Sequence, residues 1–258
     1  MLSAAAVVLG LAMTGPSNIW GTLGFGIYPT DAQKVAPNGL VYDPLFRFTA
    51  DLNVRATEHL KFFFDFAFWA EAPSPGVTTN GNQGQFDFTR RQIDFTAGIG
   101  YSFSRGYELR LWNYCQCNMN RGIDLNRPSG FKDGTAGSLR YYLDKEWSFD
   151  PDYLEGGYYF TKELADTRGN PYTPGLFAGG KYTLPVKGHV YFSTEANLLT
   201  ERPAKPKELY VKAGLLYRLG QVPQKSELGV FYERDIGLLG LPGRGRVLLE
   251  IKRYFSSD

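Results

Sequence analysis

Apolar and polar residues alternate with a period of two along most of the chain. In the clearest run, residues 60–69, phenylalanines such as Phe64 share one parity, while Lys61 and Asp65 share the other. Residues 47–55 alternate in the same way, and no window shows a sustained helical period. Because successive side chains of a strand point to opposite faces, the pattern predicts strands with one apolar and one polar face.

Over the whole sequence, the alternation predicts about twelve strands. They are expected at residues 18–28, 42–56, 58–71, 88–104, 106–118, 136–147, 153–163, 174–184, 187–200, 207–219, 226–235 and 245–255. The connections between them alternate in length. Tight ones are expected at 56–58, 104–106 and 185–187, moderate ones at 148–152 and 221–226, and long ones at 29–41, 72–87, 118–134, 164–172 and 237–244, with 201–205 shorter than its long neighbours.

This alternation of short and long connections is typical of membrane β-barrels, which have short periplasmic turns and longer outer loops. A soluble β-sandwich is not expected to alternate in this way. We therefore predict an all-β fold, an antiparallel up-and-down transmembrane β-barrel of about twelve strands. An even number of strands would place both termini at the short-turn end, in the periplasm.

The apolar parity, to which Leu249 belongs, is expected to face lipid. An arginine or lysine on that face costs about 2–4 kcal/mol at the bilayer midplane and about 0–1 kcal/mol near the interface. The charges of this parity fall only at strand ends, with Arg91, Lys162 and Arg234 at the long-connection end and Arg253 at the other. The first three would suit contacts with lipopolysaccharide phosphates, or ordinary snorkelling into the interface.

The opposite parity carries charges of both signs, which are candidates for lining a lumen or binding a solute. They are Arg47, Asp51, Arg55, Lys61, Asp65, Asp94, Glu108, Arg110, Arg140 and Asp144, followed by Glu155, Lys181, Glu195, Lys212, Arg218, Glu233, Glu250 and Lys252. Lone buried charges are costly, so we expect cross-strand pairing or hydration, with Glu108 and Arg110 facing Asp94. A narrow wet channel and a lumen filled with salt bridges both fit a barrel of this size.

Composition favours such a barrel over a bundle of membrane helices. Mean hydropathy is −0.28, whereas each helical span needs about 20 consecutive apolar residues. The net charge of +2 gives no sign of a nucleic-acid partner. The apolar run 2–13 suits the core of a secretory signal peptide, although no Lys or Arg precedes it, and a short N-terminal helix is the alternative. We therefore divide the chain into an incomplete signal peptide, 1–14, and one barrel domain, 15–258.

From residue 18 to residue 255, the chain resembles the Gram-negative outer-membrane β-barrel class. The last strand, 247–255, ends at Phe255 as the final strands of such barrels end in an aromatic residue, but three more residues follow it. The resemblance implies a location in the outer membrane, surrounded by its lipid and lipopolysaccharide. It also implies that the barrel-assembly machinery is a partner.

Catalysis is judged from the two histidines. Enzymatic outer-membrane barrels, including lipid hydrolases, use His with Ser and an acidic residue towards the outer end. His59 and His189 fall beside predicted tight turns, at the other end, and neither has an obvious Ser–Asp setting within about 2.6–3.2 Å reach. Both are also remote from the two cysteines, so a metal site is poorly supported. We expect no enzymatic activity, metal or cofactor.

Cys115 and Cys117 lie on one face of an expected strand. Their Cα atoms would be about 6.6 Å apart, near the limit for a disulfide, so a bridge would need a bulge or bend, and two reduced cysteines are the alternative. Asn113 on the apolar parity suggests such a bulge, which would also turn Trp112 and Tyr114 to the other face.

The connection 118–134 is the longest expected outer loop. Arg121, Arg127 and Lys132 are candidates within it for constricting a pore or binding an anionic sugar. A solvated loop stabilised by its own Asx turns is the alternative.

These features lead to one main functional hypothesis, a narrow outer-membrane channel for small hydrophilic or charged solutes. Charged pore linings orient and select solutes, and the polar parity would supply such a lining. A closed structural or adaptor barrel in an envelope complex is the alternative, with an outer-membrane lipid hydrolase third. A soluble lipid-binding barrel is a further class.

Overall fold

The computed structural model describes residues 19–36, 39–71, 89–118, 131–143, 151–160, 175–201, 205–220, 225–236 and 245–256. Within these ranges it has twelve strands: β1 (Ile19–Ala36), β2 (Gly39–Arg55), β3 (Leu60–Glu71), β4 (Thr89–Ser104), β5 (Tyr107–Asn118), β6 (Phe131–Tyr142), β7 (Tyr153–Tyr159), β8 (Leu176–Lys187), β9 (Val190–Glu201), β10 (Lys205–Leu219), β11 (Ser226–Ile236) and β12 (Gly245–Ser256). The predicted signal segment, 1–14, lies outside the described residues.

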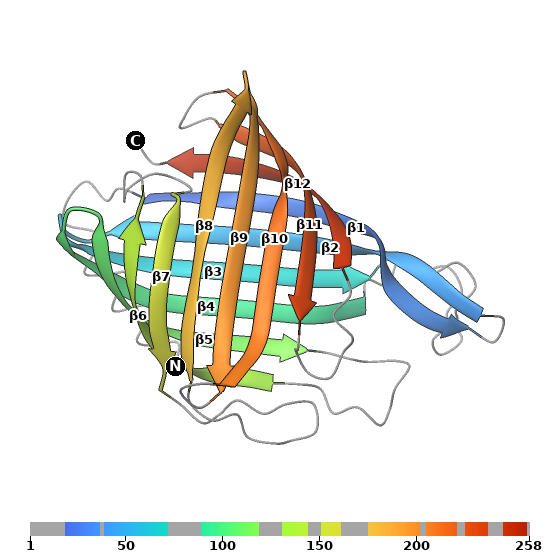
Figure 1. Cartoon of the computed structure of the whole chain (residues 1–258), viewed down its shortest axis with the longest axis horizontal. Coiled ribbons are helices and arrows are strands. Elements are labelled where there is room, and N and C mark those ends of the chain that lie inside the picture. Colours follow the sequence, from blue (N-terminus) through green and yellow to red (C-terminus); the bar gives the residue numbers. More distant parts are fainter. Residues whose placement is uncertain are drawn as a thin grey trace.

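Each strand pairs antiparallel with the next in sequence, and β1 pairs with β12 to close a barrel. Within the closed part of the described barrel, each strand has a partner on both sides, so the backbone hydrogen bonds of the wall are satisfied within the wall. In Figure 1, β7 to β10 cross the strands β2 to β5 behind them at a steep angle, as tilted strands of a closed barrel do. The predicted fold class is confirmed.

Tight turns gather at one end of the barrel, called here the short-turn end. β4 and β5 are joined by residues 105–106, and β8 and β9 by residues 188–189. Gly106 and Gly188 have positive φ values of 83° and 57°. Two-residue hairpin turns require this conformation, which glycine adopts without steric cost. The turn predicted at 104–106 is confirmed, whereas the turn predicted at 185–187 lies at 188–189, because β8 continues to Lys187.

The first hairpin is longer than predicted. β1 continues to Ala36 and β2 begins at Gly39, so the expected long loop at 29–41 is wrong. A register shift between Tyr28 and Ala32 interrupts the pairing, which then resumes. Backbone pairing does not need an alternation of apolar residues. Because this alternation is absent here, a prediction based on it did not identify the strands. Figure 1 shows this hairpin projecting beyond the other strands.

The sixth strand is displaced from its predicted bounds. It begins at Phe131, so Lys132 lies in β6 opposite Gln116 and not in a loop as predicted. It ends at Tyr142, which leaves Asp144 outside the described residues. The early start is explained by β5, whose last residues need hydrogen-bonding partners although 131–135 lacks apolar alternation.

The outer wall is apolar. Its exposed large side chains include Ile99, Tyr101, Phe103, Leu139, Tyr141, Leu143, Phe192, Leu215, Tyr217, Leu228, Val230, Val247, Leu249 and Ile251. The predicted lipid-facing parity is confirmed for these positions. Among the described residues, no helix is long and apolar enough to cross a membrane.

Strand β5 keeps its face throughout. Asn113 is exposed on the outer wall, Trp112 is buried and Tyr114 packs with the buried side chains. The register with β4 and β6 is regular across this region, so the predicted bulge is wrong. A single outward asparagine is thus accommodated in the wall without a change of parity.

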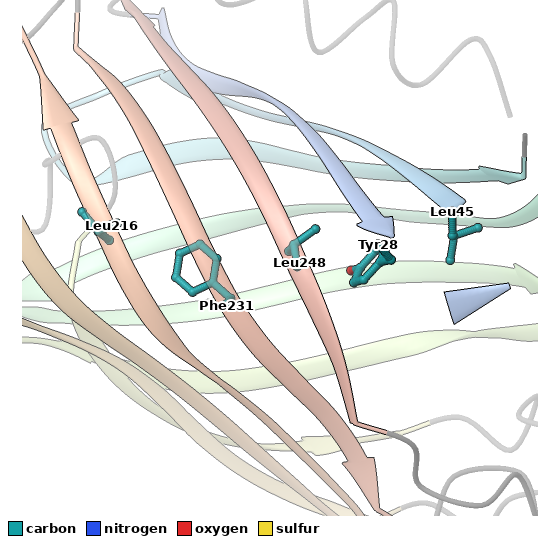
Figure 2. Close-up of a cluster of buried hydrophobic side chains, with 5 residues drawn as sticks. All are labelled: Tyr28, Leu45, Leu216, Phe231 and Leu248. Carbon is teal, nitrogen blue, oxygen red and sulfur yellow. The ribbon is translucent and has the colours of Figure 1, made fainter. Parts of the chain in front are cut away.

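Inside the barrel, two apolar clusters form. One contains Tyr28, Leu45, Leu216, Phe231 and Leu248, from β1, β2, β10, β11 and β12; Figure 2 shows these side chains. The other contains Phe63, Trp112 and Ala136, with Tyr114, Tyr159 and Phe177 against them. The charged side chains of the lumen lie around these clusters.

Candidate functional site

The charged residues of the polar parity point into the barrel, because on each strand they alternate with the exposed apolar side chains of the outer wall. Nine of the ten leading candidates have described side chains: Arg47, Asp51, Arg55, Lys61, Asp65, Asp94, Glu108, Arg110 and Arg140. All nine are buried or half-buried. Five of them, Arg47, Lys61, Glu108, Arg110 and Arg140, belong with other charges to two networks. A third network contains none of these nine residues.

The first network, called the Glu108–Glu155 cluster, consists of Lys61, Glu108, Arg110, Arg140 and Glu155 from β3, β5, β6 and β7. Lys61 Nζ lies 2.8 Å from Glu108, and Arg110 lies 3.4 Å from Glu108 and 3.1 Å from Glu155. Arg140 Nη2 lies 2.6 Å from Glu155. Arg110 therefore joins two carboxylates that belong to different strands.

Hydroxyl groups complete this cluster. Ser138 donates a hydrogen bond to Glu155. Tyr142 donates to Glu108 at 3.1 Å and accepts one from Lys61 at 3.0 Å. Buried carboxylates that accept several hydrogen bonds from cations and hydroxyls are stable without water. Both carboxylates of the cluster are thus compensated by cations and hydroxyl groups.

The second network, called the Glu233–Glu250 cluster, contains Arg47, Lys212, Glu233, Arg246, Glu250 and Lys252. Arg47 crosses from β2 to reach Glu233 on β11 at 3.3 Å, and Arg246 lies 4.0 Å from the same carboxylate. Lys212 lies 3.2 Å from Glu250 and Lys252 lies 3.8 Å from it. Each of the two carboxylates therefore lies within 4.0 Å of at least two cations.

Two tyrosines also bind Glu233. The hydroxyl of Tyr28 donates at 2.8 Å and that of Tyr210 at 3.1 Å. Glu233 is 2% exposed, so its charge is compensated almost entirely by protein groups. It is the anchor around which strands β1, β2, β10 and β12 are held together in the lumen.

The third network lies near the short-turn end and centres on Glu227. Arg218 and Lys225 each lie 2.8 Å from its carboxylate, and Tyr254 donates a hydrogen bond at 2.7 Å. Sequence reasoning missed Glu227, Lys225 and also Arg246. Glu227 shares the parity of Glu233 on the same strand, which could have identified it.

Aromatic rings hold most of these cations from a second side. The distances from the cationic group to the ring centroid are 3.9 Å for Arg110 over Phe63, 3.9 Å for Arg140 over Tyr153, 4.0 Å for Arg218 over Tyr191, 4.2 Å for Lys212 over Phe231, 4.4 Å for Lys225 over Tyr254, 4.9 Å for Arg246 over Tyr28 and 5.3 Å for Arg47 over Trp69. Cation–π contacts stabilise a cation without supplying negative charge. The rings therefore fix the cations in place without neutralising them.

The expected pairing of Glu108 and Arg110 with Asp94 is wrong. Asp94 lies opposite Gln116, while Glu108 lies opposite Ser102 on the same pair of strands. The tight turn at 105–106 fixes the register between β4 and β5 and separates these residues along the barrel. Their ion-pair partners come from β3 and β7 instead.

Three carboxylates lie together on the inner face of β2 to β4, on a surface called here the acidic wall. Asp51 and Asp65 are directly opposite each other, and Asp94 follows two positions away on the next pair of strands. Thr22 donates a hydrogen bond to Asp51. All three carboxylates are half-buried, so they are accessible from the interior.

A cavity of about 40 Å³ lies against the inner face of strands β8 to β12. Lys181, Ser193, Glu195, Lys212, Leu216, Glu227, Gly229, Phe231, Glu250 and Lys252 line it. This volume holds a few water molecules, and charged groups on its walls can bind them. Residues of the second and third networks therefore line one cavity.

Gly100 makes room for the first network. A Cβ atom at this position would lie 2.7 Å from Glu108 Cδ, which Lys61, Tyr142 and Arg110 hold in place. We expect G100A to lower the free energy of unfolding by about 1–3 kcal/mol, because the added methyl group overpacks a fixed carboxylate. Urea denaturation in detergent micelles measures the change.

Gly156 provides the matched control for this prediction. A Cβ atom there meets no heavy atom closer than 3.9 Å, so G156A should be close to wild type. Equal stability of G100A and G156A would contradict a rigid Glu108 network.

Several sequence candidates do not join these networks. The side chains of Arg121, Arg127, Lys132, Lys162 and Arg91 lie outside the described residues. The backbone of Arg91 falls where the register of β3 and β4 shifts. Arg234 is exposed on the outer face near the end of β11, and its contact with lipopolysaccharide stays a prediction.

The disulfide also stays a prediction. Cys115 is half-buried, whereas the side chain of Cys117 lies outside the described residues. Both have regular partners on β4, Phe95 and Ile93, so the backbone shows no bulge between them.

The histidines lie at the short-turn end, as expected. His59 and His189 are exposed in the turns that follow β2 and β8, with rings 6.0 Å from Tyr101 and 5.8 Å from Tyr217. In the part of the chain that the structure describes, no group of three or more His, Cys, Asp or Glu side chains could hold a metal ion. The absence of catalysis remains an expectation.

Together, the closed antiparallel sheet, the apolar outer wall and the charged interior define a transmembrane β-barrel. No family model and no curated protein matches the chain. Among solved structures, it is similar to the CymD monoaromatic hydrocarbon channel (10% identity, TM-score 0.44, covering 98% of this chain and 92% of that one), to OprB of Pseudomonas putida (10%, 0.42, 98% and 96%) and to Salmonella typhi OmpF in complex with daunomycin (9%, 0.39, 92% and 97%). Similarity at this level does not bear on function, which must come from the residues themselves.

Proposed function

We propose that the protein is a channel of the bacterial outer membrane that carries small hydrophilic or charged solutes through a narrow lumen. The observation that supports this most directly is the partial exposure of fixed charges inside the barrel. Arg47, Arg246 and Lys252 are held by carboxylates, yet a fifth to a quarter of each side chain remains accessible. Accessible charges at fixed positions are what a selective aqueous pore requires.

The arrangement of the strand ends supports the orientation within this proposal. Trp20 near the start of β1 pairs with Ser256 at the end of β12, on the side of the tight turns. Short turns face the periplasm in outer-membrane barrels. The short-turn end, where β1 begins and β12 ends, would therefore be periplasmic.

Conductance in planar lipid bilayers tests the channel. Folded protein, identified by heat-modifiable migration on a gel, is expected to insert in discrete steps and to carry ohmic current in KCl. Protein denatured before reconstitution is the control for detergent and contaminants. Pure, folded protein that inserts but carries no current would refute the channel.

A closed adaptor barrel is the second candidate, and the packed clusters favour it. Leu248 is fully buried and Tyr254 nearly so, although both point into the barrel. If such packing extends across the whole lumen, water and ions cannot pass. Folded, inserted protein without conductance would favour this function.

A further inference from the structure

We infer that the channel prefers anions, and that its solutes carry a carboxylate, phosphate or similar anionic group. This inference rests on the proposed channel function and names its substrate class. It derives from a regular difference between the two members of the ion pairs in the lumen.

In most of these pairs, the carboxylate is the more buried member and the cation is the more accessible one. Arg246 and Lys252 are each 25% exposed. Their partners Glu233 and Glu250 are 2% and 3% exposed. Near the short-turn end, Arg218 is 25% exposed and Glu227 only 6%.

The same order holds for two pairs of the first network, where Arg140 is more accessible than Glu155 and Lys61 more than Glu108. Arg110 and Glu155 are the exception, because both are 9% exposed. A solute ion in the lumen therefore meets guanidinium and ammonium groups first, with the carboxylates behind them. The nearest charges dominate the interaction, because attraction falls with distance and ions in the lumen screen the more distant charges.

The aromatic rings strengthen this preference. Arg246 lies over Tyr28 and Arg218 over Tyr191, so each cation is positioned partly by an uncharged group. A cation held only by carboxylates would be more fully neutralised. In the Glu233–Glu250 cluster, the side chains of Arg47, Arg246 and Lys252 are 20%, 25% and 25% exposed, so a passing anion can reach them.

These cations form a strip that follows the lumen from one end towards the other. Arg47 and Arg246 lie towards the long-connection end, and Lys252 and Arg218 lie towards the short turns. The register connects the last two through Glu227, which faces Arg218 on one side and Lys252 on the other. An anion can exchange one partner for the next along such a strip, which keeps binding weak enough for release.

The carboxylates of β2 to β4 would favour the opposite selectivity, a preference for cations. Asp51, Asp65 and Asp94 are half-buried, so cations could follow that wall instead. We assign the preference to the strip because its accessible groups lie on β2, β10 and β12 and extend along the length of the barrel. The acidic wall covers only a short stretch, from the Asp51–Asp65 pair to Asp94 two positions further along.

The reversal potential across a KCl gradient tests this inference. Wild-type channels should show the sign of chloride permeation. The double variant R246Q/K252Q removes two accessible cations and should move the reversal potential towards zero or to the sign of potassium permeation. Heat-modifiable migration verifies that the variant folds.

R234Q is the matched control. Arg234 follows Glu233 on β11 but is exposed on the outer face, so loss of its single positive charge should leave the reversal potential unaltered, and R246Q or K252Q alone should shift it. A wild-type channel that prefers potassium, or an equal shift in R234Q and R246Q/K252Q, would overturn the anion preference while the channel function stands. Absence of any current would refute the channel itself.

Discussion

Replacing Val230 with arginine is expected to destabilise the barrel in a lipid bilayer by about 2–4 kcal/mol, the cost of a basic side chain at the midplane of the lipid-facing wall. Val230 lies near the middle of β11 and is 54% exposed. Its partners on both sides, Leu215 and Leu249, are exposed apolar residues of the same wall. The guanidinium therefore has no short route to water at either surface.

The strand ends supply the control. Leu219 is the last residue of β10 and is exposed on the same wall, so L219R should cost only about 0–1 kcal/mol. Arg234, already present on the outer face of β11, shows that the chain accepts arginine near a strand end. The free energy of unfolding from lipid vesicles in urea compares the two variants. Equal costs would mean that the apolar wall does not face lipid.

The wall was predictable because it depends on a local property. A period of two determines which face each side chain joins, and membrane lipid requires that pattern over the whole length of a strand. The prediction failed where the pattern is absent but pairing continues, as at the β1–β2 hairpin and at the start of β6. Phe131 and Gly39 join the sheet because a neighbouring strand offers hydrogen bonds, which no single segment reveals.

The sequence predicts which residues face the interior of the barrel, but not which of them pair with one another. Parity placed Arg47 and Glu233 on the inner face, but they are 186 residues apart in sequence and meet only because the barrel closes. Pairing also depends on register, as the failed expectation for Asp94 illustrates. The order of burial in most of the ion pairs, on which the anion preference rests, depends on side-chain packing that no alternation pattern records.

The most demanding test of this interior is Glu233. We expect E233Q to lower the free energy of unfolding by about 3 kcal/mol, at the lower end of the loss when one partner leaves a buried ion pair. The substitution keeps the shape of the side chain but removes the charge that Arg47 and Arg246 contact and that Tyr28 and Tyr210 bind. The loss stays at the lower end because both arginines are partly accessible, and water can replace some of the lost attraction.

E58Q is the control, because Glu58 lies exposed in the turn between β2 and β3. The same chemical change there should alter stability by no more than about 0.5 kcal/mol. Urea denaturation in micelles measures both variants. E233Q also removes a negative charge from beneath the cationic strip, so the channels that do fold should prefer chloride more strongly than wild type. Unchanged stability in E233Q would mean that water, and not Glu233, compensates Arg47 and Arg246.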